Sequence, residues 1–121
     1  MSTDASIEQE IQAKGKTAPR VTPADLAANI KTECYFTAAD AFKAPHLMAI
    51  AGDVPDPALH LLTFCVLVLK NGFTVTGESA CASPENFDAE IGQRIARENA
   101  VQKIWPLMGY ELKCRLAQSA A

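Results

Sequence analysis

The sequence predicts a small α+β protein. In this fold an antiparallel sheet, built on a central β-hairpin at about residues 61–82, is packed by a long C-terminal helix, with a short helix near the N-terminus. Three observations lead to this class: Asn71-Gly72 between two alternating apolar runs, helical periodicity up to Trp105, and a helix-start signal at Thr22-Pro23. A chain of 121 residues has room for one domain. We place it at 21–121, after a mobile tail at 1–20.

The hairpin is predicted from its turn. Asn-Gly favours a two-residue type I′ loop, in which both residues have positive φ. Lys70 would then face Phe73, which pairs Cys65 with Glu78 and places the Cys65 and Cys81 thiols on opposite faces, where they cannot bridge. We therefore expect the cysteines to act as small buried hydrophobes.

The first hairpin strand is apolar on both sides. One side carries Leu62, Phe64, Val66 and Val68, and the other carries Cys65, Leu67 and Leu69. Such a strand is expected at the centre of its sheet or beneath a second layer. With the register above, Glu78 lies against Cys65 and close to Leu67, an unusual environment for a carboxylate.

The N-terminal half is less regular. A short helix around Ile7–Ala13 is an alternative to the mobile tail. Thr22 and Pro23 open an amphipathic helix expected to end near Glu33, and a short strand is expected at 34–37. Residues 38–59 are expected to hold a helical turn and a loop at 52–57, with His46 and His60 as solvated loop histidines.

The C-terminal helix has two contrasting sides. A large apolar stripe is formed by Phe87, Ile91, Ile95, Val101 and Trp105, and a small-residue strip on the opposite side by Ala89, Gly92, Ala96 and Ala100. We expect the stripe to pack on the sheet, leaving the strip for a second subunit of a homo-oligomer. Arg94 and Glu98, four residues apart, can pair. Pro106 should interrupt the helix, with a further helical segment after it and a frayed end at 117–121.

Composition excludes several functions. The longest apolar run, at 61–69, is too short to span a membrane, and the N-terminus lacks a secretory signal, so we expect a cytoplasmic protein. The net charge is −3, with five Lys/Arg against eight Asp/Glu in residues 1–60, and this argues against unaided nucleic-acid binding. No cysteine or histidine has zinc-ligand spacing, and we expect no metal or other cofactor.

Enzyme motifs are also absent from the sequence. Gly77-Glu-Ser-Ala-Cys81 lacks the second glycine of a nucleophile elbow, and there is no glycine-rich phosphate loop. Glu85, Asp88 and Glu90 occupy the start of the long helix, where a phosphate would otherwise be favoured. The order of elements also resembles the α-β-β-β-α of double-stranded-RNA-binding domains, but those domains need lysines where this chain has acids.

One stretch resembles a known family. The residues are Leu69-Lys-Asn-Gly-Phe-Thr-Val-Thr-Gly-Glu-Ser-Ala-Cys81, then 84–90 and 96–107, and they are similar to a family of small proteins of tailed bacteriophages and prophages named by gene products forty-nine and sixty-six. The resemblance covers about residues 62–116. It implies a phage accessory protein working in the cytoplasm of the host bacterium, and it brings no known site residues.

Two functional hypotheses follow. The first is a non-enzymatic binding protein for host takeover or anti-defence, which holds a host protein or a small nucleotide signal. Its predicted ligand-binding residues are Glu78, Arg94, Arg97, Glu98, Asn99 and Trp105. The alternative is a purely structural ion cluster at the same residues. The second hypothesis is a nucleic-acid-binding accessory protein with a basic patch of Lys70, Arg94, Arg97 and Lys103, and with Trp105 stacking on bases.

Overall fold

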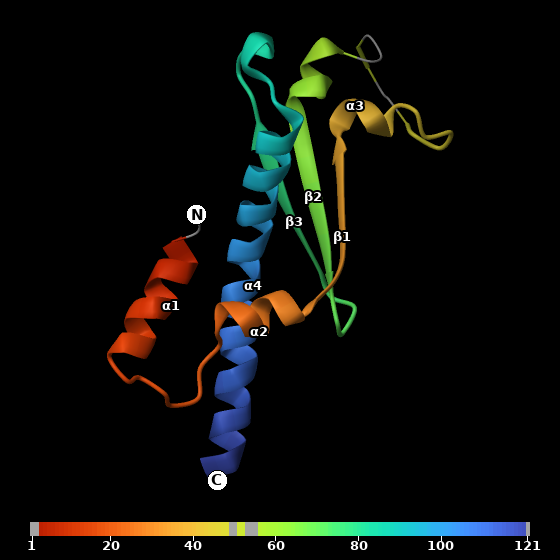
Figure 1. The fold of residues 1–121 in the computed structure, drawn as a ribbon. Coiled ribbons are helices and arrows are strands. Elements are labelled where there is room, and N and C mark those ends of the chain that lie inside the picture. Colours follow the sequence, from red (N-terminus) through yellow and green to blue (C-terminus); the bar gives the residue numbers. More distant parts are fainter. Residues whose placement is uncertain (1–2, 49–50, 53–55, 121) are drawn as a thin grey trace.

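The computed structural model describes residues 3–48, 51–52 and 56–120. Three antiparallel strands form one sheet in the order β1-β2-β3, with β1 at Ile30–Thr37, β2 at Leu62–Leu69 and β3 at Thr74–Ala80. The long helix α4, Ala89–Ala120, crosses one face of this sheet (Figure 1). The predicted α+β class is confirmed, and β2 is the central strand, as its two apolar sides indicate.

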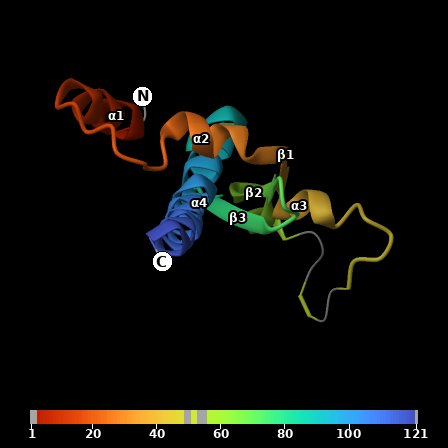
Figure 2. The same ribbon diagram turned by 90° about the horizontal axis from the view of Figure 1, so that it is seen from below.

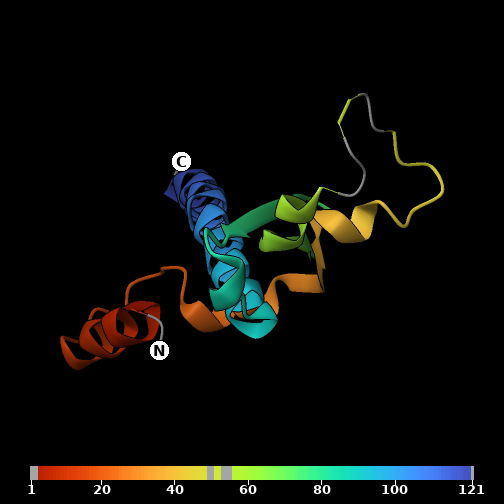
Figure 3. The same ribbon diagram turned by 90° about the horizontal axis from the view of Figure 1, so that it is seen from above.

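The remaining helices lie on different sides of the sheet. Helices α1, Thr3–Ala13, and α2, Pro23–Ala28, lie on the side of α4, whereas α3, Ala38–Ala41, and residues 42–48 after it lie on the opposite side (Figures 2 and 3). A 3-10 turn at Pro57–Leu61 returns the chain to β2, and another occupies Pro84–Asn86. The helix that the sequence allows at Ile7–Ala13 is present and starts earlier, although none of its residues is buried.

Helix α2 begins where the sequence predicts but ends five residues before the predicted end near Glu33. Thr22 accepts from the Asp25 amide and Asp25 accepts from the Thr22 amide, a complete capping box with Pro23 at the first position. The helix stops at Ala28 because the Lys70 amide donates to the Asn29 carbonyl and Ile30 then pairs with Leu69. The end near Glu33 was therefore wrong, since sheet pairing overrode the local helical pattern.

The segment 38–59 contains the expected helical turn. It is α3, which is capped by the Thr37 hydroxyl and the Asp40 carboxylate, each accepting from the other's amide. His46 and His60 are exposed, in agreement with the prediction. The loop predicted at 52–57 lies partly outside the described residues.

The hairpin register differs by one residue from the prediction. Val68 pairs with Thr74 and Cys65 with Gly77, so residues 70–72 form a three-residue loop. The Gly72 amide donates to the Leu69 carbonyl, and Gly72 alone in the loop has positive φ, +90°. The type I′ loop was wrong, because Asn71 keeps negative φ and only glycine supplies the left-handed position of a type I turn with a bulge.

This register moves every side chain of β3 to the other face. Glu78 pairs with Phe64 on the side away from α4 and is exposed, so its expected position against Cys65 was wrong. Cys81 lies on the same side as Cys65, four residues beyond its partner Gly77, about 13 Å along the strand and too far for a disulfide. All four cysteines are free, and only Cys65 is buried; Cys34 and Cys114 are exposed.

The core lies between α4 and one face of the sheet, and the helix presents its small residues there. Gly92, Ala96 and Ala100 are buried, with Ala96 and Ala100 at 0% exposure. A Cβ on Gly77 would lie 2.1 Å from the Ala96 carbonyl oxygen, so strand and helix backbones almost touch. Three of the four residues of the small-residue strip are therefore covered by this chain's own sheet, and Ala89, the first residue of α4, is exposed.

The large apolar stripe of α4 is only partly buried, because the small-residue side faces the sheet. Val101 is buried and Trp105 is half-buried, but Ile91 and Ile95 are 49% and 42% exposed on the outer side of α4. The expectation that the stripe packs on the sheet and leaves the strip free was wrong. Close packing on Gly77 decides the orientation, because only small helical residues permit that approach.

Helix α4 also passes through Pro106 without interruption and continues to Ala120. The predicted interruption, and the frayed end from Ala117, were wrong for the described residues. Proline removes one helical hydrogen bond, to the carbonyl four residues earlier. That residue, Gln102, is exposed, so its carbonyl lies on the water side of the helix, where solvation offsets the loss.

Candidate functional site

A cleft of about 500 Å³ lies where α1 and α2 meet the middle of α4. We call it the α1–α4 cleft. Five of the six predicted ligand-binding residues line it: Arg94, Arg97, Glu98, Asn99 and Trp105. They converge because α2, held by its capping box and by buried Leu26, places α1 beside one side of α4. Thr3, Asp4 and Ala5 of α1 form the other wall.

Helix α1 is fastened to this cleft by polar contacts. The Trp105 indole Nε1 donates to the Asp4 carboxylate at 3.1 Å, and Gln102 Nε2 approaches the same oxygen at 3.5 Å. Farther along α1, the Arg20 guanidinium makes a two-pronged ion pair with Glu8, which lowers the pKa of that carboxyl to about 2. The sequence contained no local signal for these contacts, since their partners lie up to 101 residues apart.

Arg97 is committed to a structural network. Its Nε donates to Glu33 at 2.8 Å, and the Tyr35 hydroxyl donates to the same oxygen at 2.8 Å. The Arg97 hydrogen bond holds the pKa of Glu33 below its ordinary value, while burial and the Glu33 carboxylate raise the pKa of Tyr35. This network links α4 to β1. The sequence predicted an ion pair among Glu78, Arg94 and Glu98, whereas the pair that forms joins Arg97 to Glu33.

Arg94 has no such commitment. Among the described residues it makes no ion pair or hydrogen bond, and the predicted Arg94–Glu98 pair does not form. Both side chains are exposed at the rim of the α1–α4 cleft. Arg94 is therefore the cation in this cleft that is available to a ligand.

Glu78, the sixth predicted residue, lies outside this cleft. Its side chain is on the open sheet face, and only its backbone carbonyl reaches the helix, where it accepts from Asn99 Nδ2 at 2.8 Å. Asn99 thus fixes α4 to β3 through a main-chain contact. The off-by-one register explains why the sequence placed the Glu78 carboxylate in the site.

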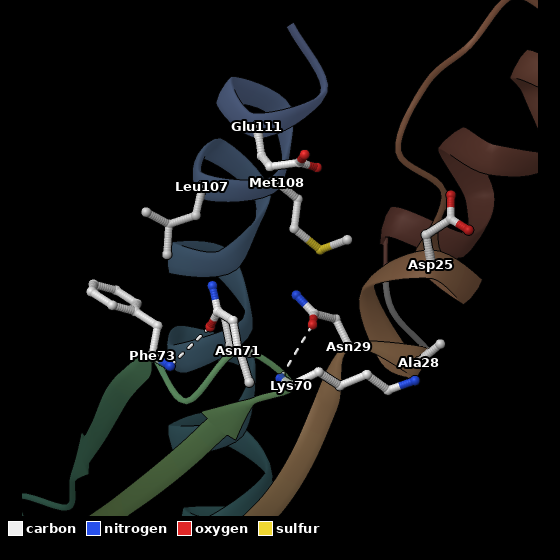
Figure 4. A pocket seen from close by; sticks show the side chains of 10 residues that line it. Asp25, Ala28, Asn29, Lys70, Asn71, Phe73, Leu107, Met108 and Glu111 are labelled. Carbon is white, nitrogen blue, oxygen red and sulfur yellow. Dashed lines mark hydrogen bonds between the residues drawn. The ribbon is translucent and has the colours of Figure 1, made fainter. Parts of the chain in front are cut away.

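A second cleft, of about 680 Å³, lies between the hairpin turn, α2 and the last turns of α4 (Figure 4). The Asn29 side-chain oxygen accepts from the Lys70 backbone amide, and the Asn71 side-chain oxygen accepts from the Phe73 backbone amide. The side-chain Nδ2 groups of both asparagines therefore point into the cleft. Leu107 and Met108 form its upper wall. The sequence did not indicate this cleft, because the cleft requires α4 to continue past Pro106.

The basic patch of the alternative hypothesis is not assembled. Lys70 lines the second cleft, Arg97 is paired with Glu33, and Lys103 lies about 180° around the helix from Arg94. The start of α4 is acidic and already capped, since Asp88 accepts from the Ile91 amide at 3.0 Å. These positions do not form one basic surface for nucleic acid.

The described residues contain no group of three or more His, Cys, Asp or Glu side chains that could hold a metal ion. No helix in the described part of the chain is long and apolar enough to cross a bilayer.

A three-stranded antiparallel sheet packed by one long helix, with a cleft beside that helix, defines a small α+β domain. Residues 21–116 match the model of the Phage protein (N4 Gp49/phage Sf6 gene 66) family, so the chain belongs to this bacteriophage family, as the resemblance implied. The match begins after α1, just before the Thr22 cap. No curated protein and no solved structure matches the chain.

Proposed function

We propose that this phage protein is a non-enzymatic binding protein that acts in the host cytoplasm during takeover or anti-defence, and that it sequesters a small nucleotide in the α1–α4 cleft. The observation that carries the proposal is the exposed, unpaired Arg94 guanidinium in the same cleft as half-buried Trp105. An arginine binds phosphate through paired N–H donors, and an indole offers a flat face to a base.

The surrounding groups support the same ligand class. Glu98 at the rim of the cleft can accept from the N–H groups of a base, while Pro23, Leu26 and Val101 provide apolar wall. A ligand of this kind needs no chemistry from the protein, in keeping with the absence of catalytic motifs in the sequence. A host protein as the partner in place of the nucleotide would use the same free arginine at the rim.

The test uses the single tryptophan of the chain. Its fluorescence is followed while the full-length protein is titrated with mono- and dinucleotides, and small molecules co-purifying from infected cells are identified by mass spectrometry. Arg94→Ala should weaken nucleotide binding by about 10- to 100-fold, the loss typical of one charge-assisted hydrogen bond, with an unchanged melting temperature.

Lys103→Ala is the matched control, because it removes a cation from the opposite side of the same helix. It should leave nucleotide binding unchanged. Equal binding by wild type and Arg94→Ala, or the absence of any nucleotide that changes the Trp105 signal, would contradict the proposal.

A further inference from the structure

In the described part of the chain, no layer of helix or strand covers the face of the sheet opposite α4. Alternate residues of β2 point to that side, and all four are apolar and only half-buried: Leu62, Phe64, Val66 and Val68. Beside them on β1, Phe36 stacks on Phe64 with ring centroids 5.3 Å apart, and Cys34 pairs with Val66. An open antiparallel face normally alternates to polar residues, so this face has the composition of an interface.

The edges of the same face are polar and nearly uncharged. Thr32 lies on one flank and Thr74 and Thr76 on the other, all exposed, with Glu78 toward one end. An apolar centre within a polar rim is the usual anatomy of a protein interface. No Lys or Arg is paired in register on this face; Lys31 lies at the bulge of β1, and Lys43, beyond α3, is paired with Asp40.

We infer that this open sheet face is covered by a second copy of the chain, giving a two-fold dimer through stacked sheets. The symmetry of the face supports this occupant. Because β2 is the central strand of three, a two-fold axis lying between the sheets, along or across β2, places β2 over its own copy. The apolar row then meets the same apolar row, and the threonines form the rim.

The open face is large enough for a dimer interface if the residues just after α3 contribute to the contact. Eight residues of β2 across three strands give a plan area of about 350–400 Å² per copy, and raised side chains increase the accessible area beyond this. Residues 42–48, after α3, project on this same side (Figures 2 and 3) and include Leu47 at 40% and Met48 at 86% exposure. Counted over both copies, the sheet face and these two side chains approach the lower end of the roughly 1,200–2,000 Å² of total surface buried in stable complexes.

This interface differs from the homo-oligomer contact expected from the sequence. That contact used Ala89, Gly92, Ala96 and Ala100, three of which are now buried under the chain's own sheet. The exposed Ile91 and Ile95 on the outer side of α4 form the competing apolar surface. The experiment is designed to separate the two surfaces.

Sedimentation and light scattering of the full chain at about 100 μM should show a dimer, since a contact of this size is expected to bind in the micromolar range. Val66→Lys should give a folded monomer, because its side chain points to the open side. Ile95→Lys, a matched apolar-to-lysine change on α4, should leave the dimer intact.

Two cysteines provide an internal readout. Cys34 lies on the open face and Cys114 on the distal part of α4, and both are exposed in the single chain. Cys34 of the wild type should react with a thiol reagent several-fold more slowly at about 100 μM protein than at about 0.1 μM, because labelling requires dissociation, whereas Cys114 should react equally at both concentrations. A monomeric wild type, a dimer that persists in Val66→Lys, or dissociation caused by Ile95→Lys would each overturn the inference.

Discussion

The two faces of the sheet use one strand in opposite ways. Toward α4, β2 contributes Cys65 and Leu67 at 0% exposure, beneath a helix whose small residues let it approach the backbone of the neighbouring strand β3 at Gly77. Away from α4, β2 contributes Phe64, Val66 and Val68, which are equally apolar but only half-buried. Apolar side chains on both faces of β2 predict that both faces will be buried, but they do not say by what. Helix α4 covers the face on which its backbone can come close to Gly77.

The largest expected effect is at the closest point of the covered face. Gly77→Ala places a methyl group 2.1 Å from the Ala96 carbonyl oxygen and 2.4 Å from the Ala100 amide nitrogen, and neither backbone can yield cheaply. We expect a loss of about 3 kcal/mol or more in unfolding free energy, measured by urea denaturation.

Thr76→Ala is the control on the neighbouring residue of the same strand, because it points to the open face. It should cost under about 1 kcal/mol. Equal losses in the two variants would mean that α4 does not rest on Gly77. Ala96→Trp, which would break an oligomer if the small-residue strip were free, should instead unfold the domain, since Ala96 is fully buried.

An intermediate loss of stability is expected at the hairpin turn, which sets the register of β3 and therefore the face on which each of its side chains lies. Gly72 has φ +90°, and Gly72→Val forces a β-branched residue into the left-handed region, at a cost of about 1–3 kcal/mol. The melting temperature measures it. Gly109→Val is the control, because both glycines have open space around them but Gly109 is helical, where valine is at least as favourable. An unchanged melting temperature for Gly72→Val would place the turn elsewhere.

The smallest effect concerns the ion pair at the edge of the covered face. Arg97 lowers the pKa of Glu33, so this pair stabilises the fold above the ordinary glutamate pKa, and the stabilisation is lost as pH falls below about 5. Both side chains are more than a third exposed, so solvent screening limits the contribution to under about 1 kcal/mol.

Glu33→Gln should reduce the loss of unfolding free energy between pH 6 and pH 4, measured by urea denaturation at each pH. Glu111→Gln, which removes an exposed pair from the distal part of α4, should leave that loss unchanged. A steeper acid loss in Glu33→Gln would reverse the assigned sign.

The sequence by itself determined the α+β class, the hairpin, the Thr22-Pro23 helix start and the five α4 residues predicted for the α1–α4 cleft. These features depend on local turn chemistry, capping and helical periodicity. Arg94, Glu98 and Trp105 share one side of any helix that contains them. Their common cleft was therefore open to prediction, although its opposite wall, α1, was not.

Tertiary structure decided the register, the orientation of α4 and the passage of α4 through Pro106. A one-residue difference in loop length moved Glu78 to the open face, and local sequence cannot distinguish two turns that both suit Asn-Gly. The helix orientation depended on Gly77, a strand residue whose missing side chain lets Ala96 and Ala100 approach. Such a contact depends on two segments meeting, so neither segment's pattern contains it.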